Sequence, residues 1–239
     1  MLPPESKFFY RRNLPHWQPA GASIFITWRL YGSLPESAII RLRDAQRLLL
    51  REAERANEKA EERKLRHHKK VFAMLDRLLD AAESGPLWLR EVAIADMIQE
   101  ALLVGYSTLY KLWSYVVMPN HVHVLLRPNV AQTSVCDVDI RSSQTEVCAT
   151  YVPLKEITKR IKGYTAREAN RIMKRTGQTF WQAESFDHWA RDDAEFYRII
   201  DYIENNPVKV GLTARPEDWQ WSSASERLRR GWHEIQALT

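Results

Sequence analysis

The chain has 239 residues, of which 45% are hydrophobic, enough for one compact domain with a sizeable core and extensions, or for two small domains. Its two cysteines, Cys136 and Cys148, lie in a polar segment, which excludes a disulfide framework and a cysteine zinc site. No apolar run is long enough to span a membrane, and the first residues lack the apolar centre of a signal peptide. We therefore expect a cytoplasmic protein with no membrane partner.

The first half of the chain is predicted to combine one strand with a long helical insertion. Residues 1–20 are rich in proline and basic residues and are expected to be irregular, whereas residues 22–30 are typical of a strand. Residues 36–104 predict the insertion, which ends with a helix at about 91–104. Within it, the highly charged segment at about 40–83 predicts an exposed helical hairpin or a protruding helix that does not touch the motif residues described below.

The next segment predicts a β-hairpin whose second strand carries two histidines. Runs of β-branched residues flank Met118-Pro119-Asn120, which indicates strands at about 108–117 and 121–127. His121 and His123 are two residues apart, so their side chains share one face of the strand. Two neutral imidazoles held in this way can bind a divalent metal. The alternative is that both are polar residues on the solvent face of an antiparallel sheet.

A basic helix is predicted after a long loop. Residues 129–152 are polar and without periodicity, which is typical of a long surface loop. Residues 154–174 predict a helix that ends at Thr176-Gly177, and residues 155–175 carry eight basic side chains against two acidic ones. Such a helix indicates contacts with phosphates, and the alternative is a solvated helix face. Residues 180–191 follow as an extended segment or strand.

The last predicted helix runs from 193 to 206 and stops before Pro207. At 100° per residue, Tyr202 and Asn206 lie together on one flank of its apolar stripe, and Tyr197 lies on the other. If the first flank faces the histidine strand, a phenol can attack a metal-bound phosphodiester. Alternatively, Tyr202 is an ordinary amphipathic tyrosine and Asn206 a helix cap. This helix is acidic, and beside the basic helix it can form a polarised cleft. Its apolar stripe consists of Phe196, Ile199, Ile200 and Ile203.

These motifs resemble a known group of enzymes. The segment 117–123 resembles the His-hydrophobic-His motif of the HUH single-strand DNA nucleases. The segment 201–212 resembles the tyrosine helix of the REP-associated tyrosine transposases. Residues 162–170, 180–182 and 215–219 also resemble that family, and the resemblance covers most of residues 8–225.

The resemblance implies an α+β, ferredoxin-like fold, with an antiparallel sheet and helices on its faces. It implies a single domain over residues 1–239, with a C-terminal tail at 208–239. It also implies a Mg²⁺ or Mn²⁺ cofactor, with His121, His123 and Asn206 as metal ligands and Tyr202 as the catalytic nucleophile. The expected products are a 5′-phosphotyrosine and a free 3′-hydroxyl.

The family's substrates are single-stranded DNA hairpins of repeated extragenic palindromes, and the REP-associated branch resembles a monomer rather than a dimer. Two alternatives stay open, a domesticated nucleic-acid-binding protein that no longer cuts, and a metallohydrolase of small phosphate esters. The basic helix and the lack of a glycine-rich phosphate loop weigh against the second. The residues predicted to contact DNA are Arg11, Arg12, Lys155, Lys159, Arg160, Lys162, Arg167 and Arg171.

Overall fold

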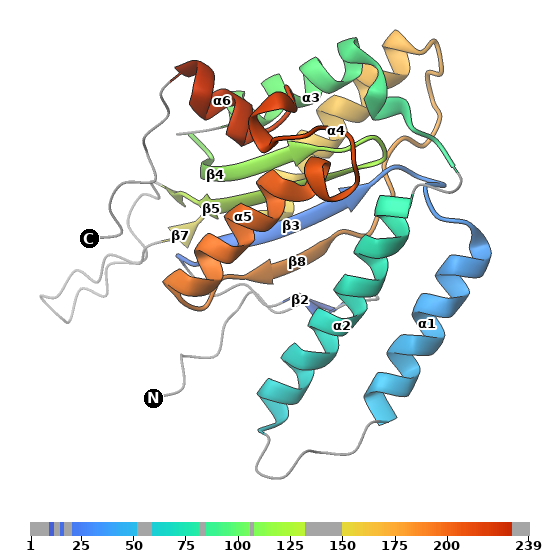
Figure 1. Cartoon of the computed structure of the whole chain (residues 1–239), viewed down its shortest axis with the longest axis vertical. Helices are drawn as coiled ribbons and strands as arrows, with labels where there is room; N and C mark the ends of the chain where they lie inside the picture. Colours follow the sequence, from blue (N-terminus) through green and yellow to red (C-terminus); the bar gives the residue numbers. More distant parts are fainter. Residues whose placement is uncertain are drawn as a thin grey trace, which may run out of the picture.

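A four-stranded antiparallel sheet lies at the centre of the chain, with strand order β4-β5-β3-β8 (Figure 1). The computed structural model describes residues 10–11, 15–16, 21–51, 59–81, 85–105, 108–131 and 150–230. The strands of this sheet are β3 (Ile24–Arg29), β4 (Tyr110–Val117), β5 (His121–Pro128) and β8 (Phe186–Trp189). Two-residue strands form two further pairs, β1 (Tyr10–Arg11) with β2 (Pro15–His16) and β6 (Val130–Ala131) with β7 (Thr150–Tyr151).

The predicted hairpin of β4 and β5 is confirmed. Val117 pairs with Val122 across it, and the backbone N–H of Met118 donates to the carbonyl of His121 at 2.9 Å. On its other side β5 pairs with β3, so the histidine strand has a neighbour on each edge. Its side chains alternate between the two faces of the sheet, and both faces are covered.

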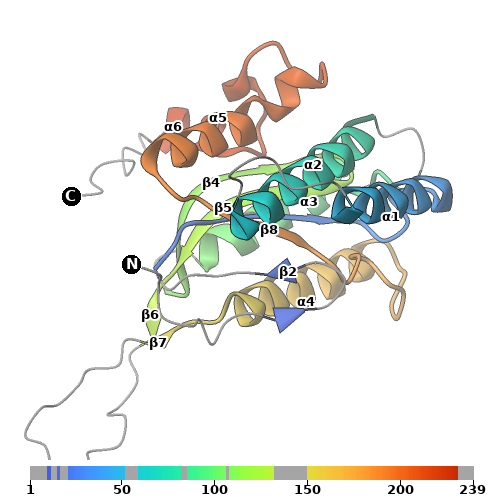
Figure 2. The ribbon, with the colours of Figure 1, turned by 90° about the horizontal axis from the view of Figure 1, so that it is seen from below.

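Two pairs of helices cover the sheet, one pair on each face. The α3 (Val92–Val104) and α4 (Leu154–Ile172) helices cover one face, and α2 (Ala60–Ala81) and α5 (Asp193–Lys209) cover the other. Figure 2 shows α4 and α5 on opposite sides of the sheet. The sequence order β3, α3, β4, β5, α4, β8 with this strand order is a split βαβ arrangement, so the predicted α+β, ferredoxin-like fold is confirmed.

The remaining helices lie outside this arrangement. The α1 helix (Glu36–Arg51) packs against α2 through Leu34, Ala38 and Leu79, so the charged segment forms a helical pair. A short 3-10 turn, η1 (Trp88–Arg90), precedes α3. A second, η2 (Pro216–Asp218), and α6 (Ser223–Arg230) follow α5.

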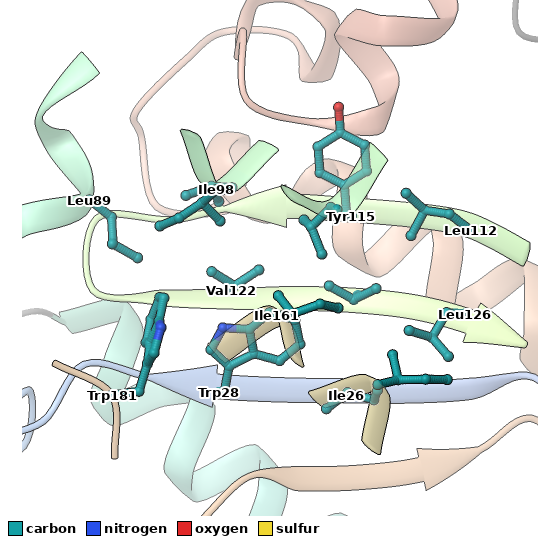
Figure 3. Close-up of a cluster of buried hydrophobic side chains, with 14 of the residues drawn as sticks. Ile26, Trp28, Leu89, Ile98, Leu112, Tyr115, Val122, Leu126, Ile161 and Trp181 are labelled. Carbon is teal, nitrogen blue, oxygen red and sulfur yellow. The ribbon is translucent and has the colours of Figure 1, made fainter. Parts of the chain in front are cut away.

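The larger apolar cluster fills the space between the sheet and the α3 and α4 pair. Trp28, Val122 and Leu126 come from adjacent strands, with Ile98 of α3 and Ile161 of α4 against them (Figure 3). Burying such side chains removes about 25 cal/mol per Å² of apolar surface from water, which fixes the helices on this face. The opposite face carries a smaller apolar cluster beside the histidines.

One predicted helix end is wrong and another is displaced by two residues. The last predicted helix does not stop before Pro207, because α5 continues through it to Lys209. Proline so close to a helix end removes only one hydrogen bond, and the extra residues form part of the last turn. The basic helix ends at Ile172, two residues before the predicted end at about 174. The predicted Gly177 is in the left-handed conformation (φ 85°), and so is Lys174 (φ 54°).

Some predictions fall outside the described residues. Arg12, residues 132–149 of the predicted loop and residues 231–239 of the tail are not described, and only the backbone of Arg11 is. Within the described ranges, none of the helices is both long and apolar enough to cross a bilayer.

Replacing Ile98 with alanine is expected to destabilise the protein by about 2–5 kcal/mol, because it leaves a cavity under the sheet. Ile98 is fully buried, whereas Val104 of the same helix is 78% exposed. Urea unfolding of Ile98→Ala and of Val104→Ala as the control measures the difference. Equal stability of the two variants would contradict this packing.

Candidate active site

The two histidines of β5 lie on the sheet face that α2 and α5 cover. His121 is 1% exposed and His123 is fully buried. The alternative of a solvent-facing pair is therefore wrong. Their Nε2 atoms lie 3.0 Å apart, so the two rings converge on one point beneath the helices.

Neighbouring polar groups orient both imidazoles. The Asn120 amide donates to the carbonyl of Leu79 at 3.0 Å, which turns its oxygen toward Nδ1 of His121 at 2.6 Å. Since that oxygen can only accept, Nδ1 of His121 carries the proton and Nε2 keeps its lone pair. Nδ1 of His123 lies 2.7 Å from the hydroxyl of Thr27, its partner across the sheet. Such outer contacts are typical of metal-binding histidines.

The charge state of His121 follows from its burial. Loss of solvent lowers the pKa of His121 well below its usual value. His121 is therefore neutral near pH 7, the state in which an imidazole binds a metal.

The α5 helix brings Tyr202 and Asn206 to the same point. The carboxamide nitrogen of Asn206 lies 3.4 Å from Nε2 of His123, and the ring centroids of Tyr202 and His123 are 5.6 Å apart. Asn206 is fully buried, and Tyr197 is an exposed residue of the same helix. The structure therefore gathers all four predicted site residues, and it separates Tyr197 from them.

The phenol of Tyr202 is held in its protonated form. Burial raises the pKa of Tyr202 far above its usual value, and the nearby charges of Asp76 and Asp80 raise it further. Its hydroxyl is buried without a hydrogen-bond partner among the described residues. Ionising this phenol therefore requires a positive charge beside it.

Asp76 of α2 is a member of the cluster that the sequence analysis missed. A carboxylate oxygen of Asp76 lies 3.4 Å from Nε2 of His123, and the other accepts from Lys209 at 3.0 Å. Burial raises the pKa of Asp76, but interactions with His123, Tyr202 and Lys209 outweigh it, so its pKa lies below its usual value. The expectation that the 40–83 segment does not touch the motif residues is wrong, because α2 covers the site.

A sequence signal for Asp76 exists. Phe72, Leu75, Asp76 and Leu79 fall at positions i, i+3, i+4 and i+7 of one helix, so the aspartate interrupts an apolar stripe. Acidic side chains are almost never buried unless they are paired. Only the structure supplies the partners, since Lys209 belongs to the part of α5 beyond Pro207.

The residues at this point fit a divalent cation. Ligand atoms of Asp76, His121 and His123 all lie within 4.8 Å of one another. One oxygen each of Asp76, Asn206 and Tyr202 is buried and has no hydrogen-bond partner within the described part of the chain. Buried polar atoms are normally paired, so an ion or ligand is the simplest missing partner.

An ion cluster beside the site joins α2 to α5. Glu195 accepts from Lys69 at 2.6 Å and from Arg191 at 2.8 Å, and Nε2 of His188 lies 3.1 Å away. Burial raises the pKa of Glu195, but these partners outweigh burial and hold it below its usual value. A cavity of about 360 Å³, lined in part by Lys69, Phe72 and Tyr202, lies next to this cluster.

The basic α4 helix does not share a cleft with the acidic α5 helix. The two lie on opposite faces of the sheet, so the predicted polarised cleft is wrong (Figure 2). The reason is that β5 sends its histidines toward α5 and its valines toward α4. Most of the basic side chains predicted to contact DNA are nevertheless exposed, namely Lys155, Lys159, Arg160, Arg167 and Arg171.

A groove of about 640 Å³ runs beside α4. Lys155, Lys159 and Lys162 line it, together with residues 178–185. Lys162 differs from the other two, because its ammonium donates to the carbonyls of Gln182 and Ala183. It therefore fixes the following segment against α4.

The fold and the cluster together agree with the resemblance stated in the sequence analysis. A ferredoxin-like sheet, a buried histidine pair on a central strand and a tyrosine on the covering helix form the arrangement implied by the resemblance to the HUH nucleases.

Comparison with known proteins finds two relatives with informative names. No family model matches the chain. It is 25% identical over 108 residues to a Haemophilus influenzae protein provisionally named a REP-associated tyrosine transposase, covering 45% of this chain and 54% of the relative. It is 31% identical over 58 residues to the REP-associated tyrosine transposase of Escherichia coli, covering 24% and 35%. The chain is therefore similar to proteins that carry this name, in agreement with the resemblance of its motifs, and it spans about half or less of the length of these relatives.

A solved structure is also similar. It is described as a REP-associated tyrosine transposase bound to a REP hairpin, and it is 16% identical to this chain. The similarity covers 96% of this chain and 90% of that one, with a TM-score of 0.46.

Replacing Glu195 with glutamine is expected to destabilise the protein by about 2 kcal/mol at pH 7, because charged hydrogen bonds are lost. The folded-state pKa of Glu195 is lowered, so its contribution is present above the unfolded value and is lost as the pH falls below about 4.3. The gap between the two proteins should therefore narrow toward pH 3. Urea unfolding from pH 7 to pH 3 measures it.

The exposed Glu100 on α3 supplies the control. Glu100→Gln should differ from the wild-type protein by less than about 0.5 kcal/mol at every pH. A gap for Glu195→Gln that stays constant down to pH 3 would contradict the ion cluster.

Proposed function

We propose that this protein is a metal-dependent single-strand DNA transposase and endonuclease that cleaves and rejoins DNA through Tyr202. The observation that carries the proposal is the convergence of His121, His123, Asn206 and Tyr202 on one buried point. Two of these residues come from β5 and two from α5, which are 79 or more positions apart in the chain. Neither a structural core nor simple nucleic-acid binding requires such a set.

In the proposed site His121, His123 and Asn206 hold Mg²⁺ or Mn²⁺. When bound, the cation withdraws charge from the scissile phosphate and stabilises the developing negative charge of the transition state. Asn120 keeps His121 in the tautomer that leaves Nε2 free, and the Thr27 hydroxyl can accept from Nδ1 of His123 so that its Nε2 is free as well. The burial of the histidines excludes bulk water, which competes with the tyrosine as nucleophile.

The proposed chemical step is a transesterification. The Tyr202 oxygen attacks phosphorus, a P–O bond to tyrosine forms and the P–O3′ bond breaks. The proton that the phenol gives up is transferred to the departing 3′ oxygen, so atoms and charge balance. The product is a 5′-phosphotyrosine with a free 3′-hydroxyl. Since a phosphodiester is exchanged for another, the step can run backward and rejoin DNA.

The proposed substrate is a single-stranded DNA hairpin, bound by the protein as a monomer. The relatives named REP-associated tyrosine transposase support a DNA substrate. The exposed basic side chains of α4 supply phosphate contacts that do not depend on the sequence. Because α4 lies across the sheet from Tyr202, these contacts hold DNA away from the point of cleavage.

A second candidate function is binding of nucleic acid without cleavage. The observation that favours it is the closure of the site, since His123 and Asn206 are fully buried beneath α2 and α5. Metal-dependent cleavage of a labelled hairpin distinguishes the two candidates. A protein that binds the hairpin in Mn²⁺ and in EDTA alike, with no product in either, fits the second.

Tyr202→Phe is expected to bind hairpin DNA with unchanged affinity and to form no covalent adduct, because only the nucleophilic oxygen is removed. Adducts between protein and labelled DNA are measured on denaturing gels with Mn²⁺, and with EDTA as the metal-free arm. Tyr197→Phe is the control on the same helix and should form adducts at the wild-type rate. Adducts of normal yield with Tyr202→Phe would remove this nucleophile from the proposal.

Replacing both Lys155 and Lys159 with alanine is expected to weaken hairpin binding by about 3- to 30-fold at 0.1 M salt and to flatten its salt dependence, since phosphate contacts are lost. Fluorescence anisotropy at several salt concentrations measures both effects. The matched control replaces the exposed Arg41 and Arg43 of α1, which removes the same charge elsewhere. Equal losses in the two double variants would show that only the total charge matters.

A further inference from the structure

We propose that Asp76 is a further ligand of the divalent cation, so that α2 completes the metal site formed by β5 and α5. This inference rests on the proposed function and extends it to a residue outside the motifs that carry the family resemblance. It gives α2 a role in metal binding in addition to covering one face of the sheet.

The first argument is the position of the carboxylate. Its oxygen lies 3.4 Å from Nε2 of His123, and the two imidazole Nε2 atoms are 3.0 Å apart. Adjacent ligands of one octahedral ion with bonds of about 2.1 Å are separated by about 3 Å. The spacing of these three ligand atoms is therefore already close to that of a coordination shell.

The second argument is the unpaired oxygen. Asp76 is 4% exposed, and its Oδ1 atom has no hydrogen-bond partner among the described residues, whereas Oδ2 accepts from Lys209. A buried carboxylate with one open oxygen is unfavourable unless a cation or donor faces it. That oxygen faces Nε2 of His123, the atom that is predicted to bind the metal.

The third argument is the chemistry of the ligand set. Two imidazoles and a carboxamide are all neutral, and Mg²⁺ and Mn²⁺ bind anionic oxygen ligands more strongly. Asp76 supplies the negative charge that the other three residues lack. The distance from the Asn206 amide to His123 also matches this shell, with the open Oδ1 of Asn206 as its ligand atom once the amide is turned.

The alternative role of Asp76 is that of an anchor for α2. Lys209 donates to Asp76 at 3.0 Å and to Asp80 at 2.6 Å, so this ion-pair group fastens α2 to the last turn of α5. An anchor and a ligand respond differently to loss of Lys209. Removing the lysine breaks the anchor, but it leaves the carboxylate and its charge beside the histidines.

Mn²⁺ binding to the full chain without DNA tests the proposal, measured by titration calorimetry and by the rise in melting temperature at saturating Mn²⁺. Asp76→Asn should raise the Kd for Mn²⁺ by about tenfold or more. Asp80→Asn is the matched control on α2 and should change the Kd by less than about threefold. Lys209→Gln should bind Mn²⁺ as tightly as the wild-type protein or more tightly, even though its metal-free melting temperature falls.

The outcomes distinguish failure of the proposed ligand role of Asp76 from failure of the proposed metal-dependent function. An unchanged Kd for Asp76→Asn, with binding lost in His123→Ala, overturns the ligand role and leaves the proposed histidine site standing. Equal weakening in Asp76→Asn and Lys209→Gln overturns it in favour of the anchor. No Mn²⁺ binding by the wild-type protein at millimolar concentration overturns both proposals. If Asp76→Asn does not fold, Asp76→Glu and Lys209→Gln decide between ligand and anchor by the same measurement.

Discussion

The orientation of two buried imidazoles is the constraint on which the rest of the site depends. His121 and His123 lose their solvation under α2 and α5, so their ring nitrogens must find partners within the protein. Asn120 and Thr27 hydrogen-bond to the Nδ1 atoms of His121 and His123, and the two Nε2 atoms face each other. Two buried nitrogen lone pairs that face each other are unfavourable without a partner, and a bound cation would supply that partner. The sheet holds the two histidines rigidly, since β5 is paired on both edges.

The two faces of the sheet have different roles, one structural and one in the candidate site. One face carries the large apolar cluster under α3 and α4, which gives the domain its stability and frees the other for polar groups (Figure 3). That other face carries fewer apolar residues and holds the histidines, Asp76, Tyr202 and Asn206. The α4 helix presents its basic side chains to solvent on the far side, away from the tyrosine. Phosphate binding and bond cleavage are therefore proposed for separate surfaces of one small domain.

The α2 helix covers the site, so the histidines and Asn206 are buried. It contributes Asp76 directly and is fastened by Lys209 and by the cluster around Glu195. Both fastenings join α2 to α5, the helix that carries the tyrosine. A charged helical segment of this kind is easily taken for a solvated appendage, because most of its residues are exposed and only one stripe is buried.

The sequence by itself determined the hairpin, the shared face of the two histidines, the buried stripe of α5 and the neighbouring positions of Tyr202 and Asn206. All of these follow from the local periods of strands and helices, which hold within one element. Only the tertiary structure decided that α4 and α5 lie on opposite faces, that α5 continues past Pro207 to Lys209, and that Asp76 reaches His123. Those facts depend on how elements far apart in the chain pack together, and no local period records which face of a sheet a helix will cover.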